Sequence, residues 1–306
     1  MSVSKFLDPK NDVAFKRIFG TEKNKDILIH FVNDILELRN DDRIREVTFL
    51  STVQEPEIAS KKQSIVDIMC VDEKGTKIIV EMQVSPQEGF EKRAQYYAAK
   101  AYSRQLNKGK EEGSRYKDLK AVVFIAISDY IVFPDKVFYK SDHIILDKHT
   151  YSHDLKDFSF SFIELPKFKI TDLKLLTNII EKWCYFFKNA HKTNERDLEQ
   201  IIGSDSVIKK AYEELNQFNW SEVELHTYEQ ETKRIMDNQA THDYMINQAL
   251  AQGKAEGIAE GKAEGIAEGE NKRNLAIAKR MLMEGIDIKT ISTVTGLSKK
   301  EIEDIY

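Results

Sequence analysis

The spacing of apolar residues changes several times along the chain and predicts a mixed order of helices and strands. Apolar positions recur every three or four residues over 11–38, which predicts a helix in two pieces broken near Gly20. Shorter apolar runs at 44–53 and within 64–84 predict strands, the second stretch folding as a hairpin. The next predicted elements are a helix at 88–107, a strand buried on both faces at 119–128, and strands at 137–146 and 158–165.

From residue 171 onward the pattern is helical, and we predict an α-helical subdomain at 169–245. In the following segment, 246–270, the octet KAEGIAEG occurs twice and every fourth residue from Gly253 to Gly269 is glycine. Each interior glycine weakens a helix by about 1 kcal/mol. One reading of this segment is a semi-flexible linker, and the other is a close-packed helix pair that joins two copies of the chain as a homo-oligomer.

The last segment, 271–306, predicts short helices separated by a turn at Gly296 and a cap at Ser298, an outline similar to a helix-turn-helix. Its final helix carries the acidic residues Glu301, Glu303 and Asp304. Because such a helix would be repelled by phosphates, this charge favours a helical cap or oligomerisation element over a DNA-reading unit.

Composition narrows the class of protein. The chain has 306 residues, of which 41% are hydrophobic and 32% charged, and a formal net charge of -5, so nucleic-acid binding would require a local basic patch. Its two cysteines, Cys70 and Cys184, lie far apart in apolar surroundings and are typical of reduced core thiols. The chain shows neither an apolar signal core nor a run of membrane-spanning length, so we expect a cytoplasmic protein that does not enter a membrane.

Two carboxylates interrupt the apolar hairpin. Asp67 lies among the apolar residues of the first strand, and Glu81 and Gln83 follow the apolar residues of the second. Buried carboxylates need a partner or a metal, and strand alternation places these side chains on one face. We therefore predict a divalent cation, Mg²⁺ with Mn²⁺ as the alternative, held by Asp67, Glu81 and the backbone carbonyl of Met82.

Neighbouring segments supply further candidates. Asp12, near the start of the first helix, is predicted to approach as another acid, although an acid there also stabilises the helix dipole. On the helix at 88–107 we expect Arg93 to bind a phosphate, with Tyr97 and Gln105 supporting the site. The plainer alternatives are a structural ion pair between Asp67 and Lys77 or Lys61, and a solvated helix face for Lys16 and Arg17.

The arrangement of Asp67, thirteen residues, then Glu81-x-Gln83 resembles the PD-(D/E)xK nuclease superfamily. The segments FLDPKNDVAFKRIFG, VEMQ, RAQYYAAKAYSRQL and LKAVVFIAIS, with the glycine-rich tail, are similar to its Rpn branch, the recombination-promoting nucleases or PD-(D/E)xK family transposases. The resemblance implies an α/β restriction-endonuclease-like αβββαβ core with a mixed sheet over residues 1–168, followed by helices. It also implies a metal-dependent DNA endonuclease linked to recombination.

Gln83 departs from the superfamily pattern, which has lysine at this position. Glutamine is usual in the Rpn branch, so it does not imply an inactive enzyme, but it leaves the general base unassigned. The alternative function is a catalytically silent DNA-binding or oligomerising protein that keeps the nuclease fold.

Overall fold

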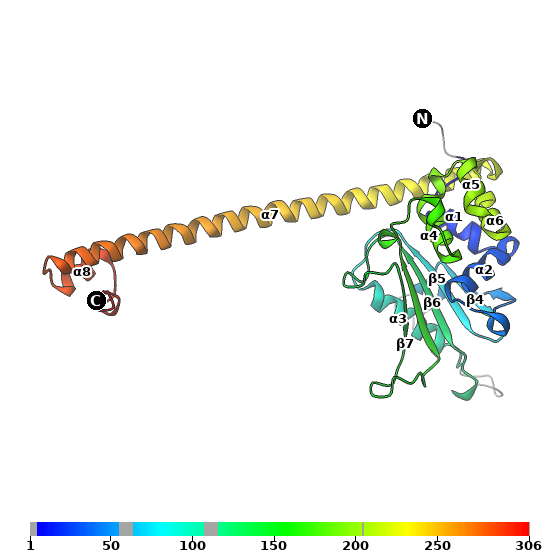
Figure 1. The fold of residues 1–306 in the computed structure, drawn as a ribbon, viewed down its shortest axis with the longest axis horizontal. Coiled ribbons are helices and arrows are strands. Elements are labelled where there is room, and N and C mark those ends of the chain that lie inside the picture. The colour runs from blue at the N-terminus through cyan, green and yellow to red at the C-terminus, as the bar shows by residue number, and fades with distance from the viewer. Residues whose placement is uncertain (1–4, 55–63, 107–115, 204, 306) are drawn as a thin grey trace. The chain divides into compact units, whose positions relative to one another are not determined.

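The computed structural model describes the chain except for residues 1–4, 55–63, 107–115, 204 and 306. Contacts divide the chain into two compact units, Met1–Asn238 and Gln239–Tyr306. The first unit contains a sheet with helices on both faces (Figure 1). Short 3₁₀ turns join its elements at Glu22–Asn24, Asn40–Asp42, Tyr116–Asp118, Leu165–Lys167, Leu173–Leu175, Ala190–Lys192 and Gln217–Asn219.

Two helices open the first unit, α1 (Asp12–Phe19) and α2 (Lys25–Ile35). Helix α1 begins where the side chain of Asn11 accepts a hydrogen bond from the backbone N–H of Val13, as an N-cap does. It ends at Gly20, where a Cβ atom would lie 2.8 Å from the carbonyl oxygen of Lys16. The predicted break near Gly20 is confirmed, and its cause is the close backbone approach.

The sheet is mixed, as expected for the αβββαβ core. Its strand order is β1-β4-β5-β6-β8-β7. Strands β5, β6 and β8 are parallel neighbours, whereas the β1–β4, β4–β5 and β7–β8 pairs are antiparallel. The bounds are β1 Val47–Phe49, β4 Ile68–Asp72, β5 Lys77–Gln83, β6 Val122–Ser128, β7 Lys140–Ile144 and β8 Phe158–Glu164, with helix α3 (Phe90–Ser103) between β5 and β6.

The predicted hairpin is formed by β4 and β5. Its turn is fixed by Asp72, whose carboxylate accepts hydrogen bonds from the backbone N–H groups of Lys74 (2.9 Å) and Thr76 (2.7 Å). Gly75 has a φ of 87°, a left-handed conformation that glycine adopts without strain. The predicted strand at 44–53 is wrong in part, because only β1 joins the main sheet; β2 (Val53–Gln54) pairs with β3 (Ser64–Ile65) in a separate two-stranded sheet.

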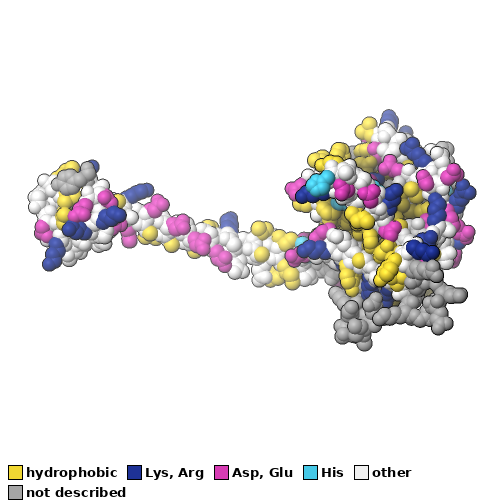
Figure 2. Space-filling model, turned by 90° about the horizontal axis from the view of Figure 1, so that it is seen from below, with side chains coloured by type: hydrophobic (Ala, Val, Ile, Leu, Met, Phe, Trp, Pro, Cys, Tyr) yellow, Lys and Arg dark blue, Asp and Glu magenta, His cyan; other side chains and the backbone are white. Residues whose placement is uncertain are grey.

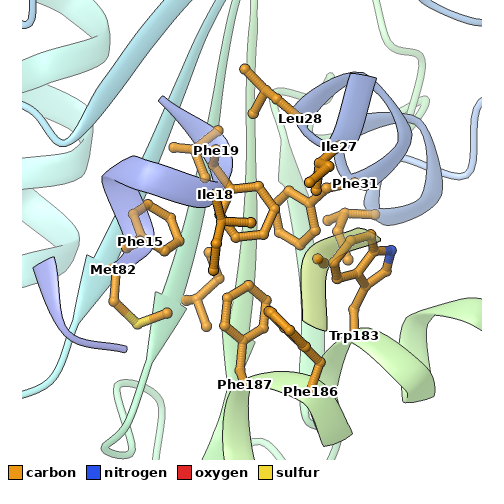
Figure 3. Packing of buried hydrophobic residues seen from close by; sticks show 14 of the residues in the cluster. Phe15, Ile18, Phe19, Ile27, Leu28, Phe31, Met82, Trp183, Phe186 and Phe187 are labelled. Carbon is orange, nitrogen blue, oxygen red and sulfur yellow. The ribbon is translucent and has the colours of Figure 1, made fainter. Parts of the chain in front are cut away.

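Each face of the main sheet has its own hydrophobic core. One face packs against α3 through Ile79, Phe124 and the small residues Ala94 and Ala98. The other packs against α1, α2, α4 (Ile179–Asn189) and α6 (Ser206–Glu214). Figure 3 shows the aromatic centre of this second core, where side chains of α1 and α2 meet those of α4.

A domain boundary at residue 168 is not seen. Trp183 and Phe187 of α4 pack against Phe19 and Phe31 of the N-terminal helices, with ring centroids 5.3–5.9 Å apart. Helices α4, α5 (Glu195–Ile202) and α6 therefore complete the core of the first unit. The predicted helical subdomain at 169–245 packs beside the sheet through α4, α5 and α6, and it shares its core with the N-terminal helices, whose aromatic face it covers.

The glycine repeat is helical, within α7 (Glu222–Met283), and its side chains are exposed. Acidic, basic and apolar side chains all reach the surface of this helix (Figure 2). A Cβ atom added at Gly253, Gly257, Gly261, Gly265 or Gly269 would meet no atom of the described chain within 4 Å. Within the single chain the glycines therefore serve no close packing.

The second unit ends in a small three-helix cluster. The end of α7 packs against α8 (Ile288–Thr295) and α9 (Lys299–Glu303) through Ala278, Ile291, Leu297 and Ile302. Gly296 ends α8 in the left-handed conformation, and Ser298 forms a capping box with Glu301. Among the described residues we find no helix that is long and apolar enough to cross a membrane.

Candidate functional site

Asp67 lies in a bend at the point where the chain leaves one sheet and enters the next. The backbone N–H of Val66 donates to the carbonyl of Thr52, the residue before β2 of the small sheet, and β4 begins only at Ile68. The carboxylate of Asp67 accepts a hydrogen bond of 2.8 Å from the backbone N–H of Met82. Asp67 was predicted inside a strand, which is wrong; its side chain instead takes the place of a strand partner for β5.

Glu81 lies opposite Asp67. The register pairs Ile68 with Val80 across the hairpin, so the next pair outward is Asp67 with Glu81. Glu81 is 3% exposed, and the carboxyl groups of the two residues hydrogen-bond to each other. Two acids buried this closely cannot both be ionised without a large cost.

The pKa values of both acids are raised. Burial and the adjacent carboxyl of Asp67 raise the pKa of Glu81 well above its ordinary value. Burial also raises the pKa of Asp67, against the opposing effect of the Met82 N–H bond. The pair therefore takes up a proton more readily than two free carboxyl groups do, and we assign that proton to Glu81, whose pKa is raised the more.

Gln83 and Arg93 extend the polar cluster along the same face. The Gln83 side-chain amide donates to Glu81 Oε2 at 3.3 Å, and Arg93 Nη2 donates to Gln83 Oε1 at 2.6 Å. The Arg93 guanidinium also hydrogen-bonds to Gln87 and lies over the rings of Phe90 and Tyr97, at 5.0 and 5.9 Å from their centroids. Helix α3 thus positions the guanidinium of Arg93 at the end of β5.

Tyr97 lies within the electrostatic reach of the two acids. Burial raises the pKa of its hydroxyl, Arg93 lowers it, and Glu81 and Asp67 raise it further. The hydroxyl therefore stays protonated near neutral pH and can act as a hydrogen-bond donor.

Helix α1 brings Asp12 and Lys16 to the same cluster. The Lys16 ammonium lies 2.9 Å from the Asp12 carboxylate, one helical turn away. The charge of Asp12 raises the pKa of Asp67, and that of Lys16 lowers it. Burial acts to lower the pKa of Lys16, but Asp12, Asp67 and Glu81 together raise it, so Lys16 stays charged.

Lys16 is the residue that sequence reasoning missed. It was assigned to a solvated helix face, and its side chain is indeed 45% exposed, but it is also a cation within reach of both buried acids. The i, i+4 spacing from Asp12 was the available signal, because a lysine there lies on the same helix face as the candidate acid.

Gln105 does not support the site. It lies beyond the end of α3, and its amide both donates to and accepts from the backbone of Lys120, at 2.8 and 2.9 Å. Lys120 precedes β6 and therefore lies at the end of the sheet opposite Gln83. The prediction for Gln105 is wrong, because its eight-residue separation from Tyr97 carries it about 12 Å along the helix direction.

The structural ion pair offered for Asp67 is not formed by Lys77, whose ammonium donates to the carbonyl of Ala101 at 2.8 Å. Lys61, the other candidate, lies outside the described residues.

The residues present suit a hard cation. Asp67 and Glu81 offer carboxylate oxygens. The backbone groups of successive strand residues point to opposite sides, and the Gln83 carbonyl bonds Asp129 on the β6 side. The Met82 carbonyl therefore points to the other side, where β4 has ended. Carboxylate and carbonyl oxygens are the ligands of Mg²⁺ and Mn²⁺. Groups of three or more His, Cys, Asp or Glu that could hold a metal ion do not occur in the part of the chain that the structure describes, so the candidate site has two carboxylates and one backbone carbonyl.

Comparison with known families matches two regions of the chain. Residues 9–245 match the model described as PD-(D/E)XK nuclease family transposase. Residues 271–306 match the model described as Rpn/YhgA-like nuclease family, C-terminal HTH domain. The preference for a helical cap at 271–306 is therefore wrong; the capped helices α8 and α9 match a helix-turn-helix domain. No curated protein and no solved structure matches the chain.

Proposed function

Because the chain belongs to the PD-(D/E)XK nuclease family transposases and ends in the helix-turn-helix domain of the Rpn/YhgA-like nucleases, we propose that it is a metal-dependent DNA endonuclease. The single observation that carries this proposal is the pair formed by the buried Glu81 and the half-buried Asp67 at the end of β5. A pair of acids with raised pKa values in the interior of a nuclease fold costs stability, and a bound cation is the physical reason to keep it.

The ion would be held by the carboxylates of Asp67 and Glu81 and by the carbonyl of Met82. We propose Mg²⁺, with Mn²⁺ as the alternative. When bound, such an ion lowers the pKa of water and offsets negative charge on a phosphodiester. The proton that the acids share must leave as the ion enters, so binding should strengthen with rising pH.

The chain's own residues orient the DNA phosphate. Arg93 can bind a phosphate through the guanidinium that now contacts Gln83, and Gln83 can rotate to orient water or a phosphate oxygen. Neither group serves as a general base. We propose that Lys16 supplies the cation that Gln83 cannot. It acts on the same acids from α1, and its ion pair with Asp12 positions it.

The C-terminal domain supports DNA as the substrate. A helix-turn-helix commonly places a helix in the DNA groove, and the match to this domain favours DNA contact over the plain oligomerisation element. A link to recombination is part of the proposal, as is a cytoplasmic site of action, which the buried free thiols of Cys70 and Cys184 support.

The test is cleavage of supercoiled plasmid by purified protein with Mg²⁺ or Mn²⁺ and with EDTA. We expect nicked or linear DNA only with a cation, and a loss of at least about 100-fold in rate for Asp67→Asn and Glu81→Gln, since each removes a ligand charge. Asp41→Asn is the matched control, because its carboxylate is fully exposed near the β4–β5 turn, at the far end of the hairpin.

Cleavage that survives Asp67→Asn at the wild-type rate would reject this site. DNA binding without any cleavage by the wild type, under either ion, would favour the silent DNA-binding protein instead. Equal loss in Asp41→Asn would indicate a general effect of charge and not a catalytic one.

A further inference from the structure

A group of basic residues lies beside the end of β5, outside the cluster of acids. The backbone N–H of Asp129, the first residue after β6, donates to the carbonyl of Gln83 at 2.8 Å. The Asp129 carboxylate in turn binds the ammonium of Lys10 at 2.8 Å. Lys10 is therefore held at the level of Gln83, which lies two strand residues, or about 7 Å, beyond Glu81.

His191 and Lys192 follow near Lys10. Its ammonium is 3.8 Å from Asp8, and the same carboxylate is 3.8 Å from the ring of His191. Lys192 follows His191 in the chain and is exposed.

Two more lysines close the group on the α4 side. Lys188 donates to the carbonyl of Phe168 at 2.6 Å, and Lys169, which is exposed, is the next residue of that segment. Their charges act on one another: burial lowers the pKa of Lys188, and Lys169 and Lys10 lower it further, while Asp129 raises it. We call Lys10, Lys169, Lys188 and Lys192 the basic patch.

The patch is more positive than local structure requires. It has four lysines, of which Lys10 pairs with the carboxylates of Asp8 and Asp129, in a chain whose net charge is -5. The C-terminal end of α4 accounts for Lys188 and Lys192, because cations stabilise that end of a helix. It does not account for Lys10 and Lys169, which come from two other segments to the same place.

Resting on the proposed nuclease function, we propose that this patch binds the phosphate backbone of duplex DNA next to the scissile bond. A strand that leaves the acids toward Asp129 reaches the patch within about two nucleotides, at 3.4 Å of helix axis each. Successive phosphates then contact Lys169, Lys188 and Lys192. The ion pair of Lys10 with Asp129 fixes the position of Lys10 beside the end of β5.

The test is a charge-removing triple variant, Lys169→Gln, Lys188→Gln and Lys192→Gln, in the full chain. Binding of a fluorescent duplex is measured by anisotropy against salt, with Ca²⁺ and in the cleavage-blocked Glu81→Gln background. We expect the slope of log affinity against log salt to fall by about 3 and the affinity at 0.15 M salt to fall on the order of 100-fold. The plasmid assay in the wild-type background should show a higher KM with kcat unchanged.

Two controls separate charge from folding. Lys117→Gln, Lys148→Gln and Lys156→Gln remove the same charge from exposed positions that flank β6, β7 and β8 at the opposite end of the sheet, and should leave slope and KM unchanged. Arginine at the three patch positions should restore both.

An unchanged slope and KM in the patch variant overturns the proposal, as does an equal loss in the control triple. The nuclease proposal fails separately, when wild-type protein cuts no DNA; the salt slope still decides whether the patch binds it.

Discussion

Replacing Glu81 with glutamine should abolish cleavage and, at the same time, make the metal-free protein more stable. Glu81 holds a proton in the fold because it is buried against Asp67. Glutamine has nearly the same shape as the protonated acid: its amide can donate to Asp67, and its carbonyl can accept the bond from Gln83. The variant therefore keeps the contacts and loses only the ionisable group.

The size and sign of the gain follow from linkage. Below the ordinary Glu pKa of 4.5 both the folded and the unfolded wild type are protonated, so the variant has no advantage. As pH rises above that value the unfolded chain ionises first, and the wild type loses stability until the raised folded pKa is passed. We therefore expect the variant to have the higher Tm above pH 4.5, by a margin that grows with pH and then levels off once the raised folded pKa is passed.

Intrinsic tryptophan fluorescence is the assay, because Trp183 and Trp220 are both buried in the first unit and are the only tryptophans of the sequence. Melting is followed from pH 4 to pH 8 in EDTA, and again with Mg²⁺, which should raise the Tm of the wild type alone. Equal Tm values at every pH, or an advantage that is largest at pH 4, would refute the reasoning.

Glu214→Gln is the matched control with the opposite sign. Although its burial acts to raise the pKa of Glu214, hydrogen bonds and charges from Lys23, Asn24 and Arg17 lower it overall. Its carboxylate therefore contributes stability that is present above the ordinary pKa and lost as pH falls. Glutamine at this position should lower the Tm by the same amount from pH 8 down to about the ordinary pKa of 4.5, and the difference should begin to close only below that pH.

Three further outcomes are expected. Arg93→Met should slow plasmid cleavage by about 10- to 100-fold, as loss of one charged hydrogen bond does. It should also move the acid limb of the pH–rate profile to higher pH, because Arg93 lowers the pKa of Glu81. An acid limb at the same pH in the variant would contradict this. Lys16→Met should lower kcat by about tenfold or more with little change in KM, and Lys16→Arg should recover most of it; equal loss in both variants would assign Lys16 a packing role. Gly257→Ala with Gly265→Ala should raise helicity by circular dichroism, by about 1 kcal/mol of helix stability per site, and sedimentation should show unchanged mass unless a second chain packs on the glycines, as the predicted homo-oligomer requires.

The apolar pattern was sufficient to predict most helices and strands of the core, because each buries a face with a clear period, whereas their αβββαβ arrangement was what the family resemblance implied. The break at Gly20 and the turn at Gly75 were readable because glycine marks each of them. The same pattern could not show that Asp67 leaves the strand, since the bend depends on the pairing of β3 with β2 in a second, small sheet. It also could not show that Trp183 and Phe187 complete the first core, because a helix carries its apolar face but not the identity of its partner.

The part of the candidate site that lies on the β4–β5 hairpin could be predicted from the sequence. Asp67, Glu81 and Gln83 lie together because their spacing along a hairpin fixes their register. Arg93 and Tyr97 follow because α3 packs on the same face. How α1 would approach the sheet could not be read from sequence, since long-range packing sets the position of Lys16.

The exposed glycine repeat of α7 has a consequence for how the protein can change over generations. The segment contains two tandem copies of the octet KAEGIAEG. One copy more or less would change α7 by about 12 Å and by more than two turns, yet would remove none of the core contacts described for either unit, because these glycines meet no neighbouring atom in the described chain. Variants that differ in repeat number should therefore fold equally well, which leaves the length of this helix open to selection as a quantity of its own.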